Sequence, residues 1–310
     1  MIDMSSKYDV TVLILTYKPS LESLLLTLKS CIEQVGITKE VIIADDGSEY
    51  FPRQKIVDLF KKYGFADYRL VENSKNSGTV LNISSGLNLA TGKYVKMISP
   101  GDYFVGTNVL SDWVTDIIKR GSKLSYSKAI YYNLKKDIVS HRMHPQQNYL
   151  GKPIDSIIKY LIQDDIVLGA TTLVCRSVLM KYISEISGKV IYAEDNIYRM
   201  MLFDGLDISY YPKNTIYYEY GEGVSTSQSE IWAKRLDNDW NETNKLLLKR
   251  NADSIFKKIA LSKIRYRLQK KGFNLLVLVA IIIKLPYMIR RKCFPRMTDI
   301  ELNSTDNSLL

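Results

Sequence analysis

Apolar runs and amphipathic segments alternate regularly over the first hundred residues. Residues 9–16 (DVTVLILT) and 40–44 (EVIIA) are almost continuous apolar, β-branched runs, which are typical of buried parallel strands. Shorter runs at 68–72 and 94–98 predict two further strands. The segment after the first strand has apolar residues at helical spacing, namely Leu21, Leu24, Leu25, Leu28 and Ile32. Four strands separated by helices predict βαβ units and an α/β fold with a mostly parallel, helix-flanked sheet.

The pattern becomes less regular beyond residue 102. Helices are predicted at 52–63 and 78–89 within the regular part, and at 109–119, 154–162, 177–186 and 194–203 beyond it. Short strands are predicted at 208–211 and 215–219. Residues 228–271 have a helical composition, and 273–289 form a mainly apolar stretch that Asn274, Lys284 and Pro286 interrupt.

The net charge of +10 is concentrated in one segment. Residues 249–296 contain 14 Lys and Arg and one acid, Asp253, whereas residues 1–248 contain 29 basic and 29 acidic residues. A localised basic block favours a polyanionic surface, which is either nucleic acid or anionic lipid. Because the basic residues flank an apolar stretch, lipid is favoured and no nucleic-acid partner is expected.

The apolar stretch itself predicts how that membrane contact is made. Residues 275–283 are nine consecutive apolar residues, and the apolar zone extends to about 17, at or below the roughly 20 that a spanning helix needs. The pattern therefore predicts an interfacial anchor on an anionic membrane surface. A true membrane span, and an interface with a partner or within a homo-oligomer, are the alternatives.

Cysteine usage and the first residues predict the compartment. Cys31, Cys175 and Cys293 are odd in number and widely spaced, so no disulfide framework is expected and a reducing compartment fits best. No N-terminal signal peptide is expected, because the first apolar run is too short. With the basic, apolar tail, this predicts a cytoplasmic protein that is peripheral on the inner face of the cell membrane.

Polar residues follow each predicted strand of the first half. They are Thr16-Tyr17, Asp45-Asp46-Gly47-Ser48, the segment 73–78, and Ser99-Pro100-Gly101-Asp102. Ligands of open parallel sheets bind beyond the carboxyl ends of the strands, so these residues are the first site candidates. Carboxylates, small residues and a helix N-terminus near Gly78 suit a nucleotide diphosphate with a divalent cation.

These segments resemble a known family. VTVLILTYKP, EVIIADDGS and NSGTVLNISSGLNLATGKYVKMISPGD are similar to the donor half of the family 2 glycosyltransferases, which have the GT-A fold. The match runs in unbroken order over residues 9–104, and a weaker one continues to Ala193-Glu194-Asp195. The resemblance implies a nucleotide-diphosphate sugar donor, a divalent metal (Mn²⁺ or Mg²⁺), and transfer with inversion at the anomeric carbon.

The resemblance also implies a role for individual residues. Asp45 is expected to bond the base or ribose of the nucleotide. The other residues expected at the donor are Thr16 and Tyr17 in the same pocket, Asp46, Gly47 and Ser48 in the turn, Asn76 and Gly78 at the sugar and phosphates, and Gly101. Asp195 is expected to be the catalytic base, because an acceptor hydroxyl must lose its proton as it attacks. Asp164 or Asp165 is the fallback.

The acidic motif departs from the family pattern. Many members have Asp-x-Asp-Asp where this sequence has Ser99-Pro100-Gly101-Asp102, so Asp102 alone is expected to bind metal, with fewer carboxylates around it. Residues 220–226 (YGEGVST) lie where family members often close a loop over the diphosphate, but they contain no histidine. His141 and His144 are expected at the surface or in an acceptor loop.

These observations predict four regions and one leading function. Residues 1–105 are the donor-binding half, 106–227 the acceptor and catalytic-base half of the same GT-A domain, 228–296 a helical, membrane-associating extension, and 297–310 a disordered tail. The expected activity is transfer of a sugar to a hydroxyl of a glycan or lipid-linked acceptor in surface-polysaccharide or capsule synthesis. The alternatives are a catalytically degenerate scaffold docked on the membrane and a nucleotidyltransferase, although Thr16-Tyr17-Lys18-Pro19 is no glycine-rich phosphate loop.

Overall fold

The computed structural model describes residues 6–133, 138–140, 157–164, 167–206, 208–219 and 230–293. Within these residues, nine strands form one sheet in the order β3-β2-β1-β4-β8-β6-β9-β5, and β7 pairs with β6. The strands are β1 (Tyr8–Thr16), β2 (Lys39–Asp45), β3 (Tyr68–Glu72), β4 (Gly92–Ile98), β5 (Tyr103–Phe104), β6 (Leu124–Asn133), β7 (Ile138–Ser140), β8 (Thr172–Cys175) and β9 (Ile208–Glu219).

The first four strands are parallel, as the sequence pattern predicts. β1 lies between β2 and β4, and β3 pairs with β2. The register aligns Thr16 with Asp45 and Ile14 with Ile98. The polar segments that follow β1, β2 and β4 therefore leave the sheet at the same side.

The rest of the sheet is mixed. β8 is antiparallel to both β4 and β6, whereas β9 is parallel to β6. The two short strands predicted at 208–211 and 215–219 form one strand, β9, whose pairing with β6 shifts register around Lys128. The α/β fold class is confirmed, with the parallel pattern confined to the first half and to the β6–β9 pair.

The helices occupy the predicted segments. They are α1 (Leu21–Ile32), α2 (Arg53–Lys62), α3 (Thr79–Leu87), α4 (Val109–Arg120), α6 (Arg176–Ile186), α7 (Ile197–Phe203), α8 (Glu230–Leu248), α9 (Ile255–Gln269) and α10 (Leu275–Cys293). Three short turns of helix are η3 (Ile158–Ile162), η4 (Gly169–Thr171) and η5 (Glu194–Asn196). The helix predicted at 194–203 is thus divided into η5 and α7, and the one predicted at 154–162 begins outside the described residues.

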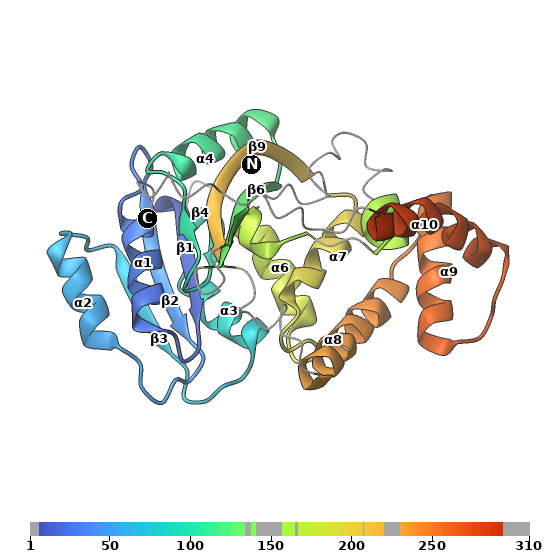
Figure 1. The fold of residues 1–310 in the computed structure, drawn as a ribbon, viewed down its shortest axis with the longest axis horizontal. Coiled ribbons are helices and arrows are strands. Elements are labelled where there is room, and N and C mark those ends of the chain that lie inside the picture. Colours follow the sequence, from blue (N-terminus) through green and yellow to red (C-terminus); the bar gives the residue numbers. More distant parts are fainter. Residues whose placement is uncertain are drawn as a thin grey trace.

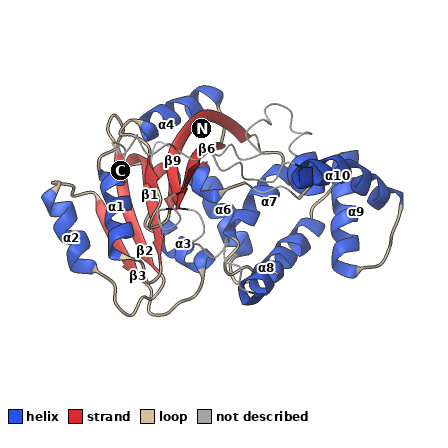
Figure 2. Cartoon of the chain, viewed as in Figure 1, coloured by secondary structure: helices blue, strands red, loops and turns tan. Residues whose placement is uncertain are grey.

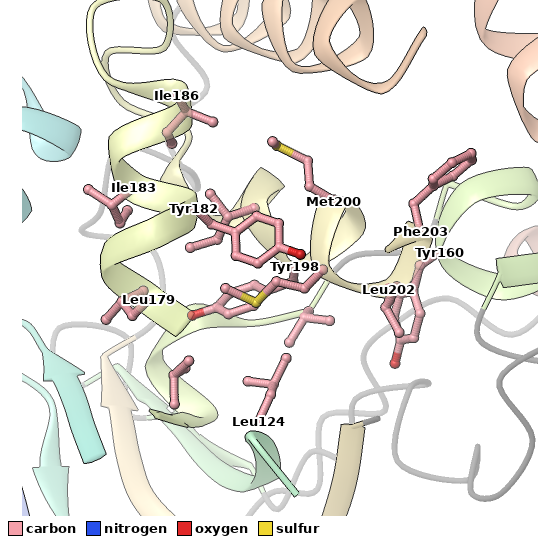
Figure 3. Close-up of a cluster of buried hydrophobic side chains, with 14 of the residues drawn as sticks. Leu124, Tyr160, Leu179, Tyr182, Ile183, Ile186, Tyr198, Met200, Leu202 and Phe203 are labelled. Carbon is pink, nitrogen blue, oxygen red and sulfur yellow. The ribbon is translucent and has the colours of Figure 1, made fainter. Parts of the chain in front are cut away.

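Helices cover both faces of the sheet (Figure 2). The sheet separates two apolar cores. One core joins the sheet to α1, α2 and α4 through side chains such as Leu28, Phe60 and Trp113. The second core joins the sheet to α3, α6 and α7 and continues into α8 and α9. Its densest part lies between α6 and α7, where Tyr182 and Tyr198 are central (Figure 3). The hydroxyl of Tyr198 is 2.8 Å from Thr172 Oγ1, so α7 is fixed against β8.

The C-terminal helices extend the molecule at the end opposite α2 (Figure 1). They are continuous with the second core, because Leu247 of α8 and Ile264 of α9 are buried in it. α10 packs through Val277 and Ala280, both almost fully buried. α8 to α10 are therefore integral to the folded body.

Asp164 connects these helices to η3. Its carboxylate is 2.6 Å from the ammonium nitrogens of both Lys263 in α9 and Lys284 in α10. Burial alone would raise the pKa of Asp164, but Lys263 and Lys284 outweigh burial and hold the pKa below its ordinary value. The stability that Asp164 contributes is thus present at neutral pH and is lost as the pH falls through this lowered pKa.

We expect Asp164→Asn to lower the free energy of unfolding by about 1–3 kcal/mol, because two largely buried ammonium groups lose their counter-ion. Urea denaturation at neutral pH measures the loss. The matched control is Asp237→Asn, whose carboxylate is 60% exposed and 3.8 Å from Arg267. The difference between wild type and Asp164→Asn should narrow as the pH falls toward the carboxyl range. Equal effects of the two variants would contradict the role of Asp164.

Candidate active site

The turn after β2 is built by two adjacent aspartates with different partners. Asp45 is buried, and its carboxylate accepts hydrogen bonds from the backbone N–H and the hydroxyl of Ser48, each at 2.7 Å. Asp46 instead accepts from the backbone N–H groups of Ser77 at 2.9 Å and Gly78 at 2.8 Å. Asp45 thus shapes its own turn, whereas Asp46 joins that turn to the start of α3.

Two glycines permit this close contact. Gly47 has φ +74°, and a Cβ there would lie 2.4 Å from the carbonyl carbon of Lys75. Gly78, the N-cap of α3, has φ +92°, and a Cβ there would lie 2.3 Å from the side chain of Ile191. Larger residues at either position would separate the segments that converge here.

The end of β1 lies beside the Asp45 turn. The backbone N–H of Asp46 donates to the carbonyl of Thr16 at 2.9 Å, and that of Lys18 donates to Ser48 Oγ at 2.6 Å. Thr16 is buried and its hydroxyl has no hydrogen-bond partner within the described residues. Tyr17 is 46% exposed, and Asn76 is also exposed. The structure therefore brings the predicted residues of β1, β2 and the 73–78 segment together.

Asp102 lies in a separate buried turn after β4. Its Oδ1 accepts from the backbone N–H of Glu219 at 2.9 Å, and its carbonyl accepts from the hydroxyl of Thr27 at 2.7 Å. Gly101 has φ +100°, and its carbonyl accepts from the hydroxyl of Tyr132. Burial raises the pKa of the Asp102 carboxyl, opposed by the Glu219 hydrogen bond and by Lys96.

Asp195 lies in η5, between β8 and α3. Its Oδ2 accepts from the backbone N–H of Gly169 at 3.3 Å, and its Oδ1 is buried with no hydrogen-bond partner within the described residues. A Cβ at Gly169 would lie 2.1 Å from Oδ1. Burial raises the pKa of Asp195 to about 6. Burial and the neighbouring Asp195 also raise the pKa of Glu194. A carboxylate with one uncommitted oxygen and a raised pKa has the properties of a general base.

The segment before Asp195 is held from two sides. The carboxylate of Asp239 in α8 accepts from the backbone N–H groups of Ile191 at 3.1 Å, Tyr192 at 2.6 Å and Ala193 at 3.0 Å. The carbonyl of Ile191 accepts from the N–H of Val80 in α3 at 3.0 Å. Asp195 is therefore positioned relative to both α8 and the segment that contacts Asp46.

Lys96 links the surroundings of Asp102 and Asp195. Its fully buried ammonium donates to the carbonyls of Met97 and Ala170, each at 2.6 Å. Ala170 follows Gly169 in η4, so this contact fixes the turn against which Asp195 packs. Burial lowers the pKa of Lys96, and Asp102 opposes that change.

The residues predicted from the sequence do not include Gly169, Lys96, Glu219 and Asp239. No local pattern distinguishes a functional role from a structural one for residues of these kinds. They are a glycine between β-branched segments, a lysine within an apolar strand, and acids near a strand end or on a helix. Their roles come from contacts between distant segments. The unexpected charge of Lys96 within the otherwise apolar run YVKMI is the nearest to such a signal.

The fallback base is less suited to catalysis than Asp195. Asp164 is paired with Lys263 and Lys284, and its pKa is lowered despite burial. Asp165, His141, His144 and the 220–226 segment lie outside the described residues.

The residues around Asp102 fit a hard divalent cation. Within the described ranges, no three His, Cys, Asp or Glu side chains form a metal-binding cluster. Mg²⁺-type sites, however, often use one or two carboxylates together with substrate phosphates. Asp102 has a carboxylate of this kind, and the Glu219 carboxylate lies against the neighbouring Gly101, where a Cβ would come within 1.9 Å of Glu219 Oε2.

Comparisons with known proteins identify the family of the chain. The family model described as Glycosyl transferase family 2 matches residues 11–182. The uncharacterized glycosyltransferase MG025 of Mycoplasma genitalium is 32% identical over 108 residues, which are 33% of this chain and only 34% of that relative.

Solved structures share the fold. S. aureus TarS 1-349 in complex with UDP has a TM-score of 0.61 and 19% identity, covering 85% of this chain and 72% of that one. The mannosyltransferase PcManGT from Pyrobaculum calidifontis, in complex with GDP-Man and Mn²⁺, has a TM-score of 0.57 and 14% identity, covering 93% and 76%. Because the family model covers more than half of the sequence, the chain belongs to glycosyl transferase family 2.

Proposed function

We propose that the protein is an inverting glycosyltransferase that moves a sugar from a nucleotide-diphosphate donor to a hydroxyl of a glycan or lipid-linked acceptor. The main observation is the position of Asp195, whose buried Oδ1 is uncommitted and whose segment contacts α3 next to the Asp46 turn. A base is thus held close to the residues assigned to the donor. Family membership disfavours the nucleotidyltransferase alternative.

Donor binding is assigned to the ends of β1 and β2 and to the start of α3. Asp45, Thr16 and Tyr17 would contact the nucleoside, since they surround one turn and Tyr17 is accessible. Asn76, which is exposed just before α3, would contact the sugar or the diphosphate. The solved structures named above contain UDP or GDP-Man, which supports a nucleotide-sugar donor for the fold.

A divalent cation would be held at Asp102 together with the donor diphosphate. When bound, Mn²⁺ or Mg²⁺ stabilises the negative charge of the departing nucleoside diphosphate. The buried turn of Asp102, Thr27 and Gly101 provides a rigid frame for such a ligand.

Asp195 would remove the proton from the acceptor hydroxyl as its oxygen attacks the anomeric carbon. The bond from this carbon to the diphosphate oxygen breaks in the same displacement, the nucleoside diphosphate leaves, and the proton remains on Asp195. One displacement with one base gives inversion, and no carboxylate nucleophile is needed.

Aromatic side chains beside Asp195 suit a glycan acceptor. Tyr192 packs edge-on against Trp232 of α8 at 4.9 Å between ring centroids, and the guanidinium of Arg235 lies 4.8 Å from the Trp232 ring. Both rings are half-buried, so part of each is accessible. Such rings provide apolar faces with polar edges, which match a sugar ring.

The exposed face of α10 supports a membrane location for this acceptor. Val277 and Ala280 pack inward, whereas the opposite face exposes apolar side chains: Leu275, Leu278, Ile281, Ile282, Leu285, Met288 and Ile289. Lys270 and Lys271 lie just before the helix and are exposed. This arrangement is typical of a helix that lies in the membrane interface, and we assign it to the anionic inner face of the cell membrane.

None of the helices in the described ranges is long and apolar enough to cross a bilayer.

Asp45→Ala should weaken binding of the donor nucleotide even without metal, because the carboxylate that organises the turn at 45–48 is lost. A thermal-shift screen of nucleotide sugars with Mn²⁺, Mg²⁺ or EDTA first identifies the donor. Calorimetry in EDTA then compares wild type, Asp45→Ala and Asp112→Ala, an exposed acid on α4, as the control. Unchanged nucleotide affinity in the Asp45→Ala variant would contradict the assignment of the nucleotide site to this turn.

Asp195→Asn should lower turnover by about 10²–10⁴-fold with little change in donor affinity, because the amide cannot accept the proton. The measurement is release of nucleoside diphosphate, with water as acceptor if no other is known. In the wild type, the rate should fall about tenfold per pH unit below about pH 6, where Asp195 becomes protonated.

Glycine substitutions give a matched pair for the same site. Gly169→Ala should reduce turnover because its Cβ displaces Asp195, whereas Gly106→Ala has no atom within 4 Å of the new Cβ and should be neutral. Normal turnover in both Asp195→Asn and Gly169→Ala would place the base elsewhere. A wild type that binds donor without any turnover would favour the scaffold alternative.

The double substitution Ile282→Asn and Leu285→Asn should abolish sedimentation with phosphatidylglycerol-containing vesicles. It removes two of the exposed apolar side chains near the middle of α10. Point substitutions are preferable to truncation, because α9 and α10 share the core and bind Asp164. Leu26→Asn with Ile118→Asn, at exposed positions on α1 and α4, is the control.

Wild-type binding should be weaker to neutral phosphatidylcholine vesicles and at high salt. If the wild type bound neither vesicle and the α10 substitutions instead dissociated an oligomer in analytical ultracentrifugation, the face would be a subunit interface.

A further inference from the structure

The acidic motif after β4 lacks side chains that could surround a cation. Of Ser99-Pro100-Gly101-Asp102, only the last residue has a carboxylate. A divalent cation of the Mg²⁺ type takes six oxygen ligands, so two phosphate oxygens and one carboxylate leave coordination positions for water or for a further carboxylate. A second acid from another part of the chain would complete such a site.

Glu219 is placed where such an acid is needed. It is the last residue of β9, and its backbone N–H donates to Oδ1 of Asp102 at 2.9 Å. Its carboxylate lies against Gly101, because a Cβ at that glycine would come within 1.9 Å of Glu219 Oε2 and 2.9 Å of Cδ. The Glu219 carboxylate therefore lies beside residue 101, where this motif has a glycine instead of an acid.

Gly101 is required for this arrangement for two reasons. Its φ of +100° is unfavourable for residues with a side chain, and its α-carbon faces the Glu219 carboxylate. The turn is further fixed by the N–H of Gly101 donating to Thr27 Oγ1 at 3.0 Å and by the Tyr132 hydroxyl donating to the Gly101 carbonyl. The turn thus presents Asp102 and accommodates Glu219 at the same time.

The buried side chain of Lys96 already has hydrogen-bond partners of its own. The ammonium of Lys96 donates to the carbonyls of Met97 and Ala170, both at 2.6 Å. The carboxylate oxygens of Asp102 and Glu219 are of the kind that Mn²⁺ and Mg²⁺ prefer as ligands.

We propose that Glu219 supplies the second carboxylate of the divalent-cation site at Asp102, in place of the acid that the motif lacks at residue 101. The inference rests on the proposed donor function, because the donor diphosphate would complete the coordination. It assigns to the end of β9 a ligand that lies 117 residues from Asp102 in the sequence.

Mn²⁺ titration followed by electron paramagnetic resonance tests this role without any turnover, because free Mn²⁺ gives a signal that diminishes on binding. The titration is done on the protein alone and with saturating UDP or GDP. Glu219→Gln keeps the size and the backbone hydrogen bond but removes the charge, and it should weaken Mn²⁺ binding by about tenfold or more. Glu219→Asp, which retains the charge on a shorter side chain, should show a smaller loss.

Glu242→Gln is the matched control, because it removes the same charge from an α8 side chain that pairs with Lys245. It should leave Mn²⁺ affinity unchanged. Equal Mn²⁺ affinity in wild type and Glu219→Gln would overturn the proposal, and so would a wild type that binds no Mn²⁺ under either condition.

Calorimetry with UDP and GDP in EDTA separates this proposal from the donor function. Unchanged nucleotide affinity in Glu219→Gln, together with weakened Mn²⁺ binding, supports the assignment. If no nucleotide binds the wild type, the proposed donor function fails, but the Mn²⁺ titration of the protein alone still decides the role of Glu219.

Discussion

The candidate site depends on the pair of hydrogen bonds that Asp46 accepts from the backbone N–H groups of Ser77 and Gly78. These bonds join the turn after β2 to the start of α3, and the absence of a side chain at Gly47 allows the two segments to pack in direct contact. The start of α3 then contacts Ile191 through Gly78 and Val80, which places the segment ending in Asp195. One carboxylate thus connects the proposed donor residues with the proposed base.

Electrostatic conditions at the site follow from burial of groups that most proteins leave in water. The pKa of Asp195 is raised to about 6 because its carboxyl is enclosed and receives only one long hydrogen bond. Because this pKa is still below 7, Asp195 is mostly ionised at neutral pH, and the raised pKa makes it a stronger proton acceptor than an exposed aspartate, as the proposed base requires. The pKa of Asp164 is instead lowered, because Lys263 and Lys284 stabilise its charge. These ion pairs attach α9 and α10 to the rest of the structure.

The sequence predicts the first half of the fold well because the determinants there are local. Apolar runs such as VTVLILT and EVIIA specify buried strands, and the turn residues after them lie at the carboxyl ends of a parallel sheet. The mixed pairing of β8, β6 and β9 is set by contacts between distant segments, and the pattern of short runs does not reveal it. Asp46 lies in the turn after β2, but its bonds to Ser77 and Gly78 cross 31 and 32 residues, and those of Asp239 cross up to 48. No periodicity encodes such distances.

The three backbone hydrogen bonds that Asp239 accepts have a consequence for the evolution of this enzyme. α8 begins the part of the chain that the sequence predicts to be a helical C-terminal extension, yet its buried Asp239 carboxylate holds the segment leading to Asp195. An exchange of C-terminal helices between relatives would therefore succeed only if the incoming helix brought an acceptor for the N–H groups of residues 191–193. The extension and the segment that contains Asp195 are expected to be inherited as one unit, so changes to the outer face of α10 have to arise by gradual substitution while α8 is retained.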